Sequence, residues 1–280
     1  MAKHILITGA SSGFGMLAAL ELGKKGHRVL ASMRSLEKSD DLIRLATKGG
    51  FAEQIKVLNL DVTSSDSIAG IQGFLKEIEK IDVLINNAGY AHGGFGEEVT
   101  IQEYREQFET NFFGAIAVTQ AVLPFMRSAK SGTIINLSSI SGLAGFPGVS
   151  PYVSSKHALE GFSESLRLEL QPFGIDVVLV EPGSYSTNIW TAGKKVSAGL
   201  MEGTSPYSSY MRKIEKQLER GSKHHGHPQE VADLIVKLCE KERVKKLRYP
   251  IGKGVRLTIL LKRILPWTLW EKMVFRILFR

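Results

Sequence analysis

The sequence predicts an α/β fold: one domain built as a doubly wound, mostly parallel sheet. Short runs of β-branched or aliphatic residues alternate with longer helical patterns along the first 250 residues. Most of these runs are apolar throughout, as expected for strands that are buried on both faces of a parallel sheet. Regular alternation of strand and helix is typical of doubly wound folds.

Each predicted strand is short and is bounded by Gly, Asn or Asp. The strands are predicted at 4–9, 27–33, 54–62, 81–89, 132–139 and 174–183, with a last short strand near 247–250. The helical patterns cover 14–25, 64–80, 100–129, 152–171 and 228–241. Residues 184–226 contain one helical piece near 205–221 and no predicted strand. A segment of this length inside a compact domain indicates a lid or substrate loop. We therefore predict a domain over 1–250, followed by an extension over 251–280.

The composition is that of an ordinary globular protein. The chain has 280 residues, of which 43% are hydrophobic and 23% charged, enough for one large domain. A single cysteine, Cys239, excludes an internal disulfide framework and fits a reducing compartment. The start "MAKH" enters an apolar run at once, so we predict no signal peptide and a cytoplasmic protein.

The net charge of +8 is unevenly distributed. Residues 241–280 hold 12 Lys/Arg against 2 Asp/Glu, so residues 1–240 hold 24 against 26. A basic tail on a near-neutral body indicates a local partner and argues against nucleic acid.

The first predicted strand leads into "TGASSGFG", with glycines at 9, 13 and 15 at the start of a helix. Glycines in this position allow a tight turn and a close approach of a pyrophosphate, and the helix N-terminus supplies amide donors. The spacing is GxxxGxG, which differs from the GxGxxG dinucleotide fingerprint. The alternative is an ordinary glycine-rich turn after a strand.

The end of the second strand predicts which cofactor is preferred. An acidic residue there would bind the 2′-hydroxyl of NAD, but the run is Ala-Ser-Met-Arg, ending at Arg34. A guanidinium can pair with a 2′-phosphate instead. We therefore predict NADP(H) in preference to NAD(H). The alternative is a solvated arginine.

Tyr152 and Lys156 lie four residues apart in "SPYVSSKHAL", 13 residues after Ser139. Positions i and i+4 share one face of a helix, about 5–6 Å apart. An ammonium that close favours the phenolate, so we expect it to lower the pKa of Tyr152 from its usual ~10. The alternative is a chance pair on an amphipathic helix. Asn111 and Ser139 are further candidate site residues. The alternative for Asn111 is a helix cap or a buried amide that satisfies backbone groups, and the alternative for Ser139 is a simple strand-end hydroxyl.

Together these segments resemble the short-chain dehydrogenase/reductase family. "TGASSGFG", "NNAG" at 86–89, Asn111, Ser139, Y-x-x-x-K at 152–156 and "PG" at 182–183 occur in that family's order and spacing. The resemblance extends from residue 3 to about 183 by motif and to about 250 by layout. The sequence is most similar to the branch with 17β-hydroxysteroid and retinol dehydrogenases. The family implies a Rossmann-like fold.

The resemblance implies specific roles for the matching residues. Tyr152 would be the general acid of carbonyl reduction or the base of alcohol oxidation, and Lys156 would lower its pKa and hold the nicotinamide ribose. Ser139 would hydrogen-bond the substrate oxygen, and Asn111 would hold a water that links Lys156 to solvent. Asp61 would touch the adenine. With Arg34 included, the expected cofactor contacts are Gly9, Ser11, Ser12, Gly13, Phe14, Gly15, Arg34, Asp61, Val62, Asn87, Ala88, Gly89, Tyr152, Lys156, Pro182, Gly183 and Thr187.

The expected function is therefore NADP(H)-dependent interconversion of a carbonyl and a hydroxyl on an apolar small molecule, in a homodimer or homotetramer. The substrate alternatives are a steroid, a retinoid or a fatty carbonyl compound. The alternative is a non-catalytic NADPH-binding sensor or scaffold, which has no need of Tyr152 or Ser139. Candidate apolar residues around the substrate are Tyr90, His92, Phe95, Phe146, Val149, Tyr185, Ile189, Trp190, Leu200, Met201, Tyr207, Tyr210 and Met211. We expect no metal site at "HHGH" (His224, His225 and His227), because no cysteine or carboxylate lies nearby at ligand spacing.

The basic tail over 253–280 has apolar stretches that are too short and too interrupted to span a bilayer. On a helix starting at Trp267, one side gathers Trp270, Met273, Val274, Ile277 and Leu278, and the opposite side gathers Lys272, Arg276 and Arg280. Such a helix is typical of one lying in a membrane interface, where basic charge adds attraction to anionic lipid. The alternatives are that the tail packs on its own domain, walls the substrate cleft or meets a second subunit.

Overall fold

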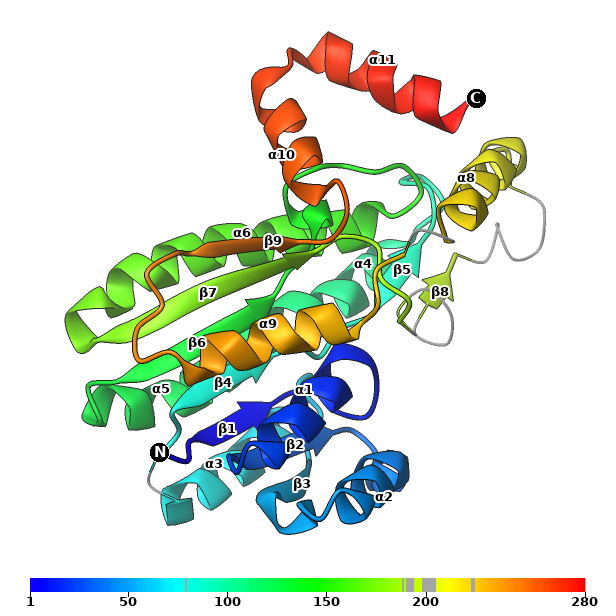
Figure 1. Cartoon of the computed structure of the whole chain (residues 1–280). Coiled ribbons are helices and arrows are strands. Elements are labelled where there is room, and N and C mark those ends of the chain that lie inside the picture. Colours follow the sequence, from blue (N-terminus) through cyan, green and yellow to red (C-terminus); the bar gives the residue numbers. More distant parts are fainter. Residues whose placement is uncertain (79, 188, 190–193, 198–204, 223–224, 280) are drawn as a thin grey trace.

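A computed structural model describes residues 1–78, 80–187, 189, 194–197, 205–222 and 225–279. It contains a seven-stranded sheet in the order β3-β2-β1-β4-β6-β7-β9 (Figure 1). Neighbouring strands are parallel throughout. This confirms the predicted fold class. The strands are β1 (His4–Ile7), β2 (Arg28–Met33), β3 (Ile55–Asn59), β4 (Val83–Asn86), β6 (Gly132–Leu137), β7 (Ile175–Pro182) and β9 (Arg248–Ile251). Five residues singled out above lie outside the described part: Trp190, Leu200, Met201, His224 and Arg280.

Helices cover both faces of the sheet, and the strand sequences explain why. In β1, Ile5 and Ile7 belong to one buried cluster and Leu6 to the other, because successive side chains of a strand point to opposite faces. The first cluster includes residues of α1 (Gly13–Lys24), α2 (Asp40–Lys48) and α9 (Gln229–Glu240). The second includes residues of α3 (Ser65–Ile78), α5 (Gly114–Ser128) and α6 (Ser150–Leu170). Both faces of each central strand are therefore core.

The long helical pattern predicted over 100–129 is interrupted by a wider turn. α4 (Ile101–Phe108) starts at a capping box, in which Thr100 Oγ1 accepts from the Glu103 amide at 3.2 Å. A π-helical turn over Glu109–Phe113 then joins α4 to α5. Such turns are frequent at functional sites, and this one buries the side chain of Asn111, which is 2% exposed.

A second, two-stranded sheet corrects the prediction that 184–226 contains no strand. β5 (Ala91–Gly93) pairs in parallel with β8 (Lys194–Val196). Each of these strands has three residues, and β8 carries two lysines, so neither has an apolar pattern that reveals it. The helical piece predicted near 205–221 is α8 (Ser208–Ser222).

The C-terminal extension folds as two helices, α10 (Val255–Ile264) and α11 (Trp267–Leu278), which lie beyond β9 at the end of the molecule that also carries α8 (Figure 1). Trp270 is 3% exposed, and Gln217 Nε2 on α8 donates to the Ile277 carbonyl at 2.7 Å. On the side of α11 that the sequence assigned to a membrane, Trp270 therefore packs on the protein, whereas Ile277 is 55% exposed. In the described part of the chain, no helix is long and apolar enough to cross a bilayer.

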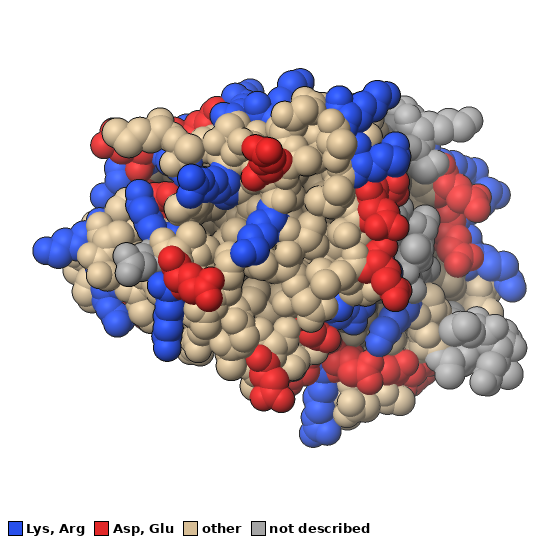
Figure 2. All heavy atoms as spheres, turned by 90° about the horizontal axis from the view of Figure 1, so that it is seen from below, with Lys and Arg blue, Asp and Glu red and all other residues tan. Residues whose placement is uncertain are grey.

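The face opposite the C-terminal helices carries charges of both signs. Figure 2 views the molecule from below, and Lys/Arg and Asp/Glu side chains are interspersed across that face. This matches the near balance of acidic and basic residues over 1–240. The excess of positive charge belongs to the last 40 residues.

Candidate active site

The predicted site residues gather at one edge of the sheet, because parallel strands all present their carboxyl ends there. Ser139 follows β6, Asn87 follows β4 and Pro182 ends β7. Helix α6 passes this edge and supplies Tyr152 and Lys156 from its first two turns. The sheet and one helix thus bring together residues that are far apart in the sequence.

Lys156 is buried and is fixed by a backbone acceptor. Its Nζ donates to the carbonyl oxygen of Leu137, the last residue of β6, at 2.6 Å. The residue is 6% exposed, and this burial lowers the pKa of the ammonium to about 8, although the nearby Glu160 carboxylate acts in the opposite direction. The lysine therefore links α6 to the end of β6 and can lose its proton close to neutrality.

Tyr152 is buried beside it, 4% exposed. Burial raises the pKa of the phenol to about 12, and a hydrogen bond with Ser139 acts in the opposite direction. The prediction that Lys156 would bring this pKa below its usual value is wrong for this geometry. The ammonium is directed at the Leu137 carbonyl, 5.7 Å from the centre of the tyrosine ring, and burial of the phenol dominates. At neutral pH the phenol is accordingly protonated, as a proton donor must be.

Ser139 lies where two central strands end. Its Oγ accepts from the Ser141 amide at 3.1 Å and lies 3.5 Å from the Pro182 carbonyl oxygen, to which it donates. It also hydrogen-bonds with Tyr152. One hydroxyl thus touches the ends of β6 and β7 and the start of α6, so its position is set by three elements.

Asn111 behaves as the buried amide that was one alternative. Its Oδ1 accepts from the Tyr90 amide at 3.1 Å, and its Nδ2 donates to the Tyr90 carbonyl at 3.0 Å and to Ser155 Oγ at 3.3 Å. Ser155 Oγ in turn donates to the carbonyl of Tyr152 at 2.8 Å. Asn111 therefore ties the chain after β4 to the helix that carries the tyrosine. Its role in holding a water stays a prediction.

The glycine-rich turn and the "NNAG" segment form one cradle. Gly9 has φ of +69°, and a Cβ there would lie 2.8 Å from Ala88 Cα. A Cβ on Gly15 would lie 2.4 Å from Asn87 Nδ2, which donates to the carbonyls of Thr8 and Gly9 at 2.9 Å each. No larger residue fits either glycine position. The cradle opens at the N-terminus of α1, whose amides suit a pyrophosphate.

The remaining expected cofactor contacts lie along the same edge. Ser11 and Ser12 stand in the turn before α1, Phe14 lies in its first turn, and Thr187 lies 3.9 Å from where a Cβ of Gly13 would be. Arg34 is exposed directly after β2, and its carbonyl accepts from Asn59 Nδ2 at 2.9 Å. Among the described residues, no ion pair engages its guanidinium.

Three further residues expected to contact the cofactor make contacts with neighbouring segments of the chain. Asp61 Oδ1 accepts from the amide and the hydroxyl of Thr63, at 2.9 and 2.7 Å. Val62 is buried, and a Cβ on Gly114 would lie 2.7 Å from its Cγ2. The Gly183 amide donates to the Ile251 carbonyl at 3.0 Å. The set predicted from the sequence thus runs along one sheet edge from β3 to β9.

A sequence model of the short chain dehydrogenase family matches residues 3–196. The chain belongs to this family. It is 49% identical over 277 residues to the oxidoreductase YusZ of Bacillus subtilis, covering 99% of both chains. It is 38% identical to a 3-ketodihydrosphingosine reductase of Bacteroides thetaiotaomicron, covering 85% of this chain and 84% of the relative. A solved structure of ElxO with NADP bound has a TM-score of 0.75 and 28% identity, covering 92% of this chain and all of ElxO.

This short-chain dehydrogenase also contains a ladder of buried side-chain hydrogen bonds that we did not predict from the sequence. Asn86 Nδ2 donates to Asn136 Oδ1 at 2.8 Å and to Thr119 Oγ1 at 2.9 Å, and Asn136 Nδ2 donates to Ser163 Oγ at 2.8 Å. These bonds join β4, β6, α5 and α6 beneath the site. Asn86 was visible in the sequence within "NNAG", but nothing in one sequence shows which residues it faces.

A second missed group is an ion cluster next to Lys156. Arg248 on β9 pairs with Glu160 at 3.0 Å, with Glu181 at 3.2 Å and with the exposed Glu164 at 2.7 Å. Glu160 lies one helical turn after Lys156, and Glu181 on β7 is 0% exposed. Burial raises the pKa of the Glu181 carboxyl to about 8, and the neighbouring Glu160 adds to the shift. Arg248 thus links α6 to β7 and to the edge strand β9.

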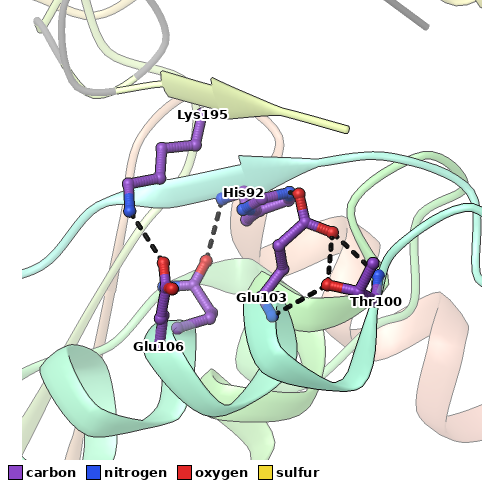
Figure 3. A network of polar contacts seen from close by, with 6 residues as sticks. His92, Thr100, Glu103, Glu106 and Lys195 are labelled. Carbon is purple, nitrogen blue, oxygen red and sulfur yellow. Dashed lines mark hydrogen bonds and ion pairs between the residues drawn. The ribbon is translucent and has the colours of Figure 1, made fainter. Parts of the chain in front are cut away.

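The segment after β4 is held by polar contacts on α4, shown in Figure 3. Lys195 on β8 pairs with Glu106 at 2.9 Å. His92 Nε2 lies 3.4 Å from Glu103, the partner of Thr100 in the capping box of α4. The His92 amide donates to Gln107 Oε1 at 2.8 Å. His92, predicted as substrate lining, is 1% exposed and belongs to this support.

Four aromatic residues predicted to line the substrate lie in two different settings. Phe95 stacks on Tyr207 of the segment before α8, with ring centres 4.2 Å apart, and lies 5.4 Å from Tyr210. Tyr185 is instead part of the core: it is 2% exposed, packs edge-on against Phe14 and donates to Glu230 at 3.2 Å. Its assignment as substrate lining is wrong, because an aromatic residue in a loop-like stretch cannot be told from a core residue by type.

The raised pKa of Glu181 predicts a pH-dependent effect of Glu181→Gln. A carboxyl whose folded pKa of about 8 exceeds its unfolded value of about 4.3 contributes stability at low pH and loses it as pH rises through about 8. Glutamine stays neutral. The free energy of unfolding of Glu181→Gln, relative to the parent, should therefore increase by on the order of 1–3 kcal/mol from about pH 5 to about pH 8.

Urea denaturation across this pH range measures the difference. The matched control is Glu164→Gln, which removes an exposed carboxylate that pairs with the same arginine, and its difference from the parent should be small at every pH. A Glu181→Gln difference that is flat with pH would contradict the burial account.

Proposed function

We propose that the protein is an NADP(H)-dependent oxidoreductase that interconverts a carbonyl and a hydroxyl on an apolar small molecule. The observation that carries this proposal is the cluster at the end of β6, where a protonated Tyr152 hydrogen-bonds with Ser139 beside the buried Lys156. Membership of the short-chain dehydrogenase family supports the reaction class.

The chemistry follows from the donors at this point. The bound cofactor would supply the hydride for the carbonyl carbon. Negative charge then grows on the carbonyl oxygen, and donors aimed at it stabilise the transition state more than the ground state. Tyr152 and Ser139 are two such donors, and Tyr152 passes its proton to the oxygen as the alcohol forms. A positioned general acid contributes on the order of 10²–10⁴-fold.

The lysine supports this proton transfer in two ways. A positive charge on Lys156 favours the phenolate that remains after Tyr152 has given up its proton. With a pKa of about 8, the ammonium is itself able to exchange a proton near neutrality. Oxidation of an alcohol uses the same groups in reverse, with Tyr152 accepting the proton.

Several features favour a dinucleotide that carries a 2′-phosphate. Gly9 and Gly15 form a tight turn that leads into the N-terminus of α1, whose amides suit a pyrophosphate. Arg34 is exposed at the end of β2, where a carboxylate would be needed for the 2′-hydroxyl of NAD. ElxO, which shares the fold, was solved with NADP bound. Arg34 would then hold the 2′-phosphate.

The nature of the substrate is inferred from side chains that follow β5 and from side chains at the start of α8. Phe95, Tyr207 and Tyr210 form an aromatic group there, and Met211 lies 3.4 Å from where a Cβ of Gly148 would be. Such surroundings suit an apolar carbonyl compound. The similarity to a 3-ketodihydrosphingosine reductase points in the same direction, towards a long-chain ketone. A non-catalytic NADPH sensor has no use for the Tyr152–Ser139 pair, which makes it the weaker candidate.

Replacement Tyr152→Phe tests the catalytic assignment. It removes the proton donor while keeping the ring in its buried place, so turnover should fall by on the order of 10²-fold or more. The measurement is NADPH oxidation with a panel of long-chain ketones and aldehydes. NADPH binding, followed by fluorescence titration, should be almost unchanged. A variant with near-normal turnover would show that Tyr152 is not the proton donor.

Replacement Arg34→Ala tests the cofactor assignment. The parent should bind NADPH more tightly than NADH, and the variant should lose most of this preference. A charge-assisted pair contributes about 1.5–3 kcal/mol, which corresponds to about 10–100-fold in affinity. Calorimetric titration with each cofactor measures both affinities, and NADH affinity should hardly change. Equal affinity of the parent for the two cofactors would contradict the assignment.

A further inference from the structure

The C-terminal helices expose an unusual share of large apolar side chains. Of the fifteen large hydrophobic residues that are exposed in the described part of the chain, eight lie between residues 257 and 279. They are Leu257, Leu260, Ile264, Trp267, Leu269, Phe275, Ile277 and Phe279. Single exposed apolar residues are normal, but a cluster of them indicates a contact surface.

Helix α10 shows the pattern most clearly. Its inner side is anchored by Val255, which is 2% exposed and lies against Gly183. Its outer side carries Leu257, Leu260 and Ile264, which are 59, 52 and 62% exposed and follow each other at helical spacing. The helix therefore holds the domain with one side and presents an apolar strip with the other.

Basic residues flank this strip. Arg256 and Arg263 are exposed seven residues apart on α10, next to the apolar strip on the helix surface. Trp267, the first residue of α11, is 62% exposed, and Lys262 Nζ on α10 lies 4.3 Å from the centre of its ring. An amphipathic tryptophan beside cations is typical of the membrane–water interface.

Helix α11 continues the arrangement. Trp270 anchors it to the protein, whereas Leu269 and Phe275 are 51 and 45% exposed, and the exposed Lys272 and Arg276 lie on the same outward side. We name the outer surface by its apolar members: the C-terminal face comprises Leu257, Leu260, Ile264, Trp267, Leu269 and Phe275.

The charge around this face selects its partner. Residues 253–279 hold six Lys/Arg and one acidic residue, Glu271, and α10 itself has no acidic residue. A second copy of the chain docked face to face would bring like charges together, which disfavours self-association through this surface. An anionic lipid surface instead complements the cations while it accepts the apolar side chains.

We propose that the C-terminal face docks on the surface of an anionic lipid membrane, with the apolar side chains inserted at the interface and the domain outside the bilayer. Contact is peripheral, because each helix has at most twelve residues and a spanning helix needs about twenty. Charged residues of both signs are interspersed across the face seen in Figure 2, away from α10 and α11, so one orientation on the membrane is favoured.

The same geometry places the proposed membrane contact close to the candidate active site. Val255 at the start of α10 lies against Gly183, which follows the Pro182 whose carbonyl contacts Ser139. On the membrane, this end of the molecule would therefore lie towards the lipid. The docking proposal itself stands on the C-terminal face alone and does not depend on the proposed reaction.

Vesicle co-sedimentation of the full chain tests the proposal. The probes are phosphatidylcholine vesicles with and without phosphatidylglycerol, at about 0.1 M and about 1 M salt, where the screening length falls from about 10 Å to about 3 Å. We expect binding to the anionic vesicles at low salt, and much weaker binding at high salt or to the neutral vesicles.

Two variants with matched controls identify the surface. Leu257→Ser/Leu260→Ser/Ile264→Ser and Arg256→Glu/Arg263→Glu should each weaken binding to anionic vesicles by on the order of tenfold or more. The controls Leu36→Ser/Ile101→Ser/Leu168→Ser and Lys38→Glu/Lys48→Glu make equivalent changes at exposed sites elsewhere and should bind like the parent. Because all these side chains are exposed, the melting temperatures should stay close to that of the parent.

Two results of the vesicle experiments would contradict the docking proposal. If the parent stays in the supernatant with anionic vesicles at low salt, or if the face variants bind as well as their controls, the proposal is wrong. A parent that does not bind vesicles but whose oligomeric state changes in the face variants would show that the surface contacts a second copy. NADPH turnover in solution is measured separately, so loss of vesicle binding with intact turnover leaves the proposed reaction standing.

Discussion

The burial of one ammonium group organises the candidate active site of this molecule. Lys156 Nζ is removed from water and donates to the last carbonyl of β6. Because a buried donor must find an acceptor, this bond sets how α6 lies along the sheet. The position of Tyr152, one turn earlier on the same helix, follows from it. Ser139, two residues beyond the accepting carbonyl, then falls within hydrogen-bonding reach of the tyrosine.

Beneath this point, buried polar side chains contact one another inside the sheet. The Asn86–Asn136–Ser163 ladder joins strands and helices through bonds of 2.8 Å, and Arg248 contacts the buried side chains of Glu160 and Glu181 near Lys156. Networks of this kind are rigid when satisfied and costly when broken. They hold α6 from below, at the sheet edge where the glycine cradle also lies.

The parts of the structure that could be predicted from the sequence are those with a local signature. The strands could be predicted because a strand buried on both faces is apolar throughout. The cradle could be predicted because only glycine fits at positions 9 and 15, where there is no room for a Cβ, and glycine is visible in the sequence. β5 and β8 have three residues each and carry no pattern. The side of α11 that contains Trp270 was recognised as apolar, but one sequence does not show whether such a side meets lipid or protein.

The electrostatics of the site could be predicted only in part, for a related reason. Spacing placed Tyr152 and Lys156 on one helix face, but the pKa of each depends on burial and on the direction of the ammonium, which only the fold determines. Likewise, one sequence does not show which groups Asn111 contacts. The structure shows its amide bonded to the backbone of Tyr90, whereas its role in holding a water stays a prediction.

The most direct test of this account is an NMR titration of the lysine side chains, with the Lys156 signal assigned by its absence from the spectrum of Lys156→Met. If burial at the end of β6 sets the properties of the site, Lys156 should titrate near its pKa of about 8, well below the ~10.4 typical of exposed lysines. A Lys156 signal that titrates together with the exposed lysines would show that the ammonium remains solvated, and would contradict the account.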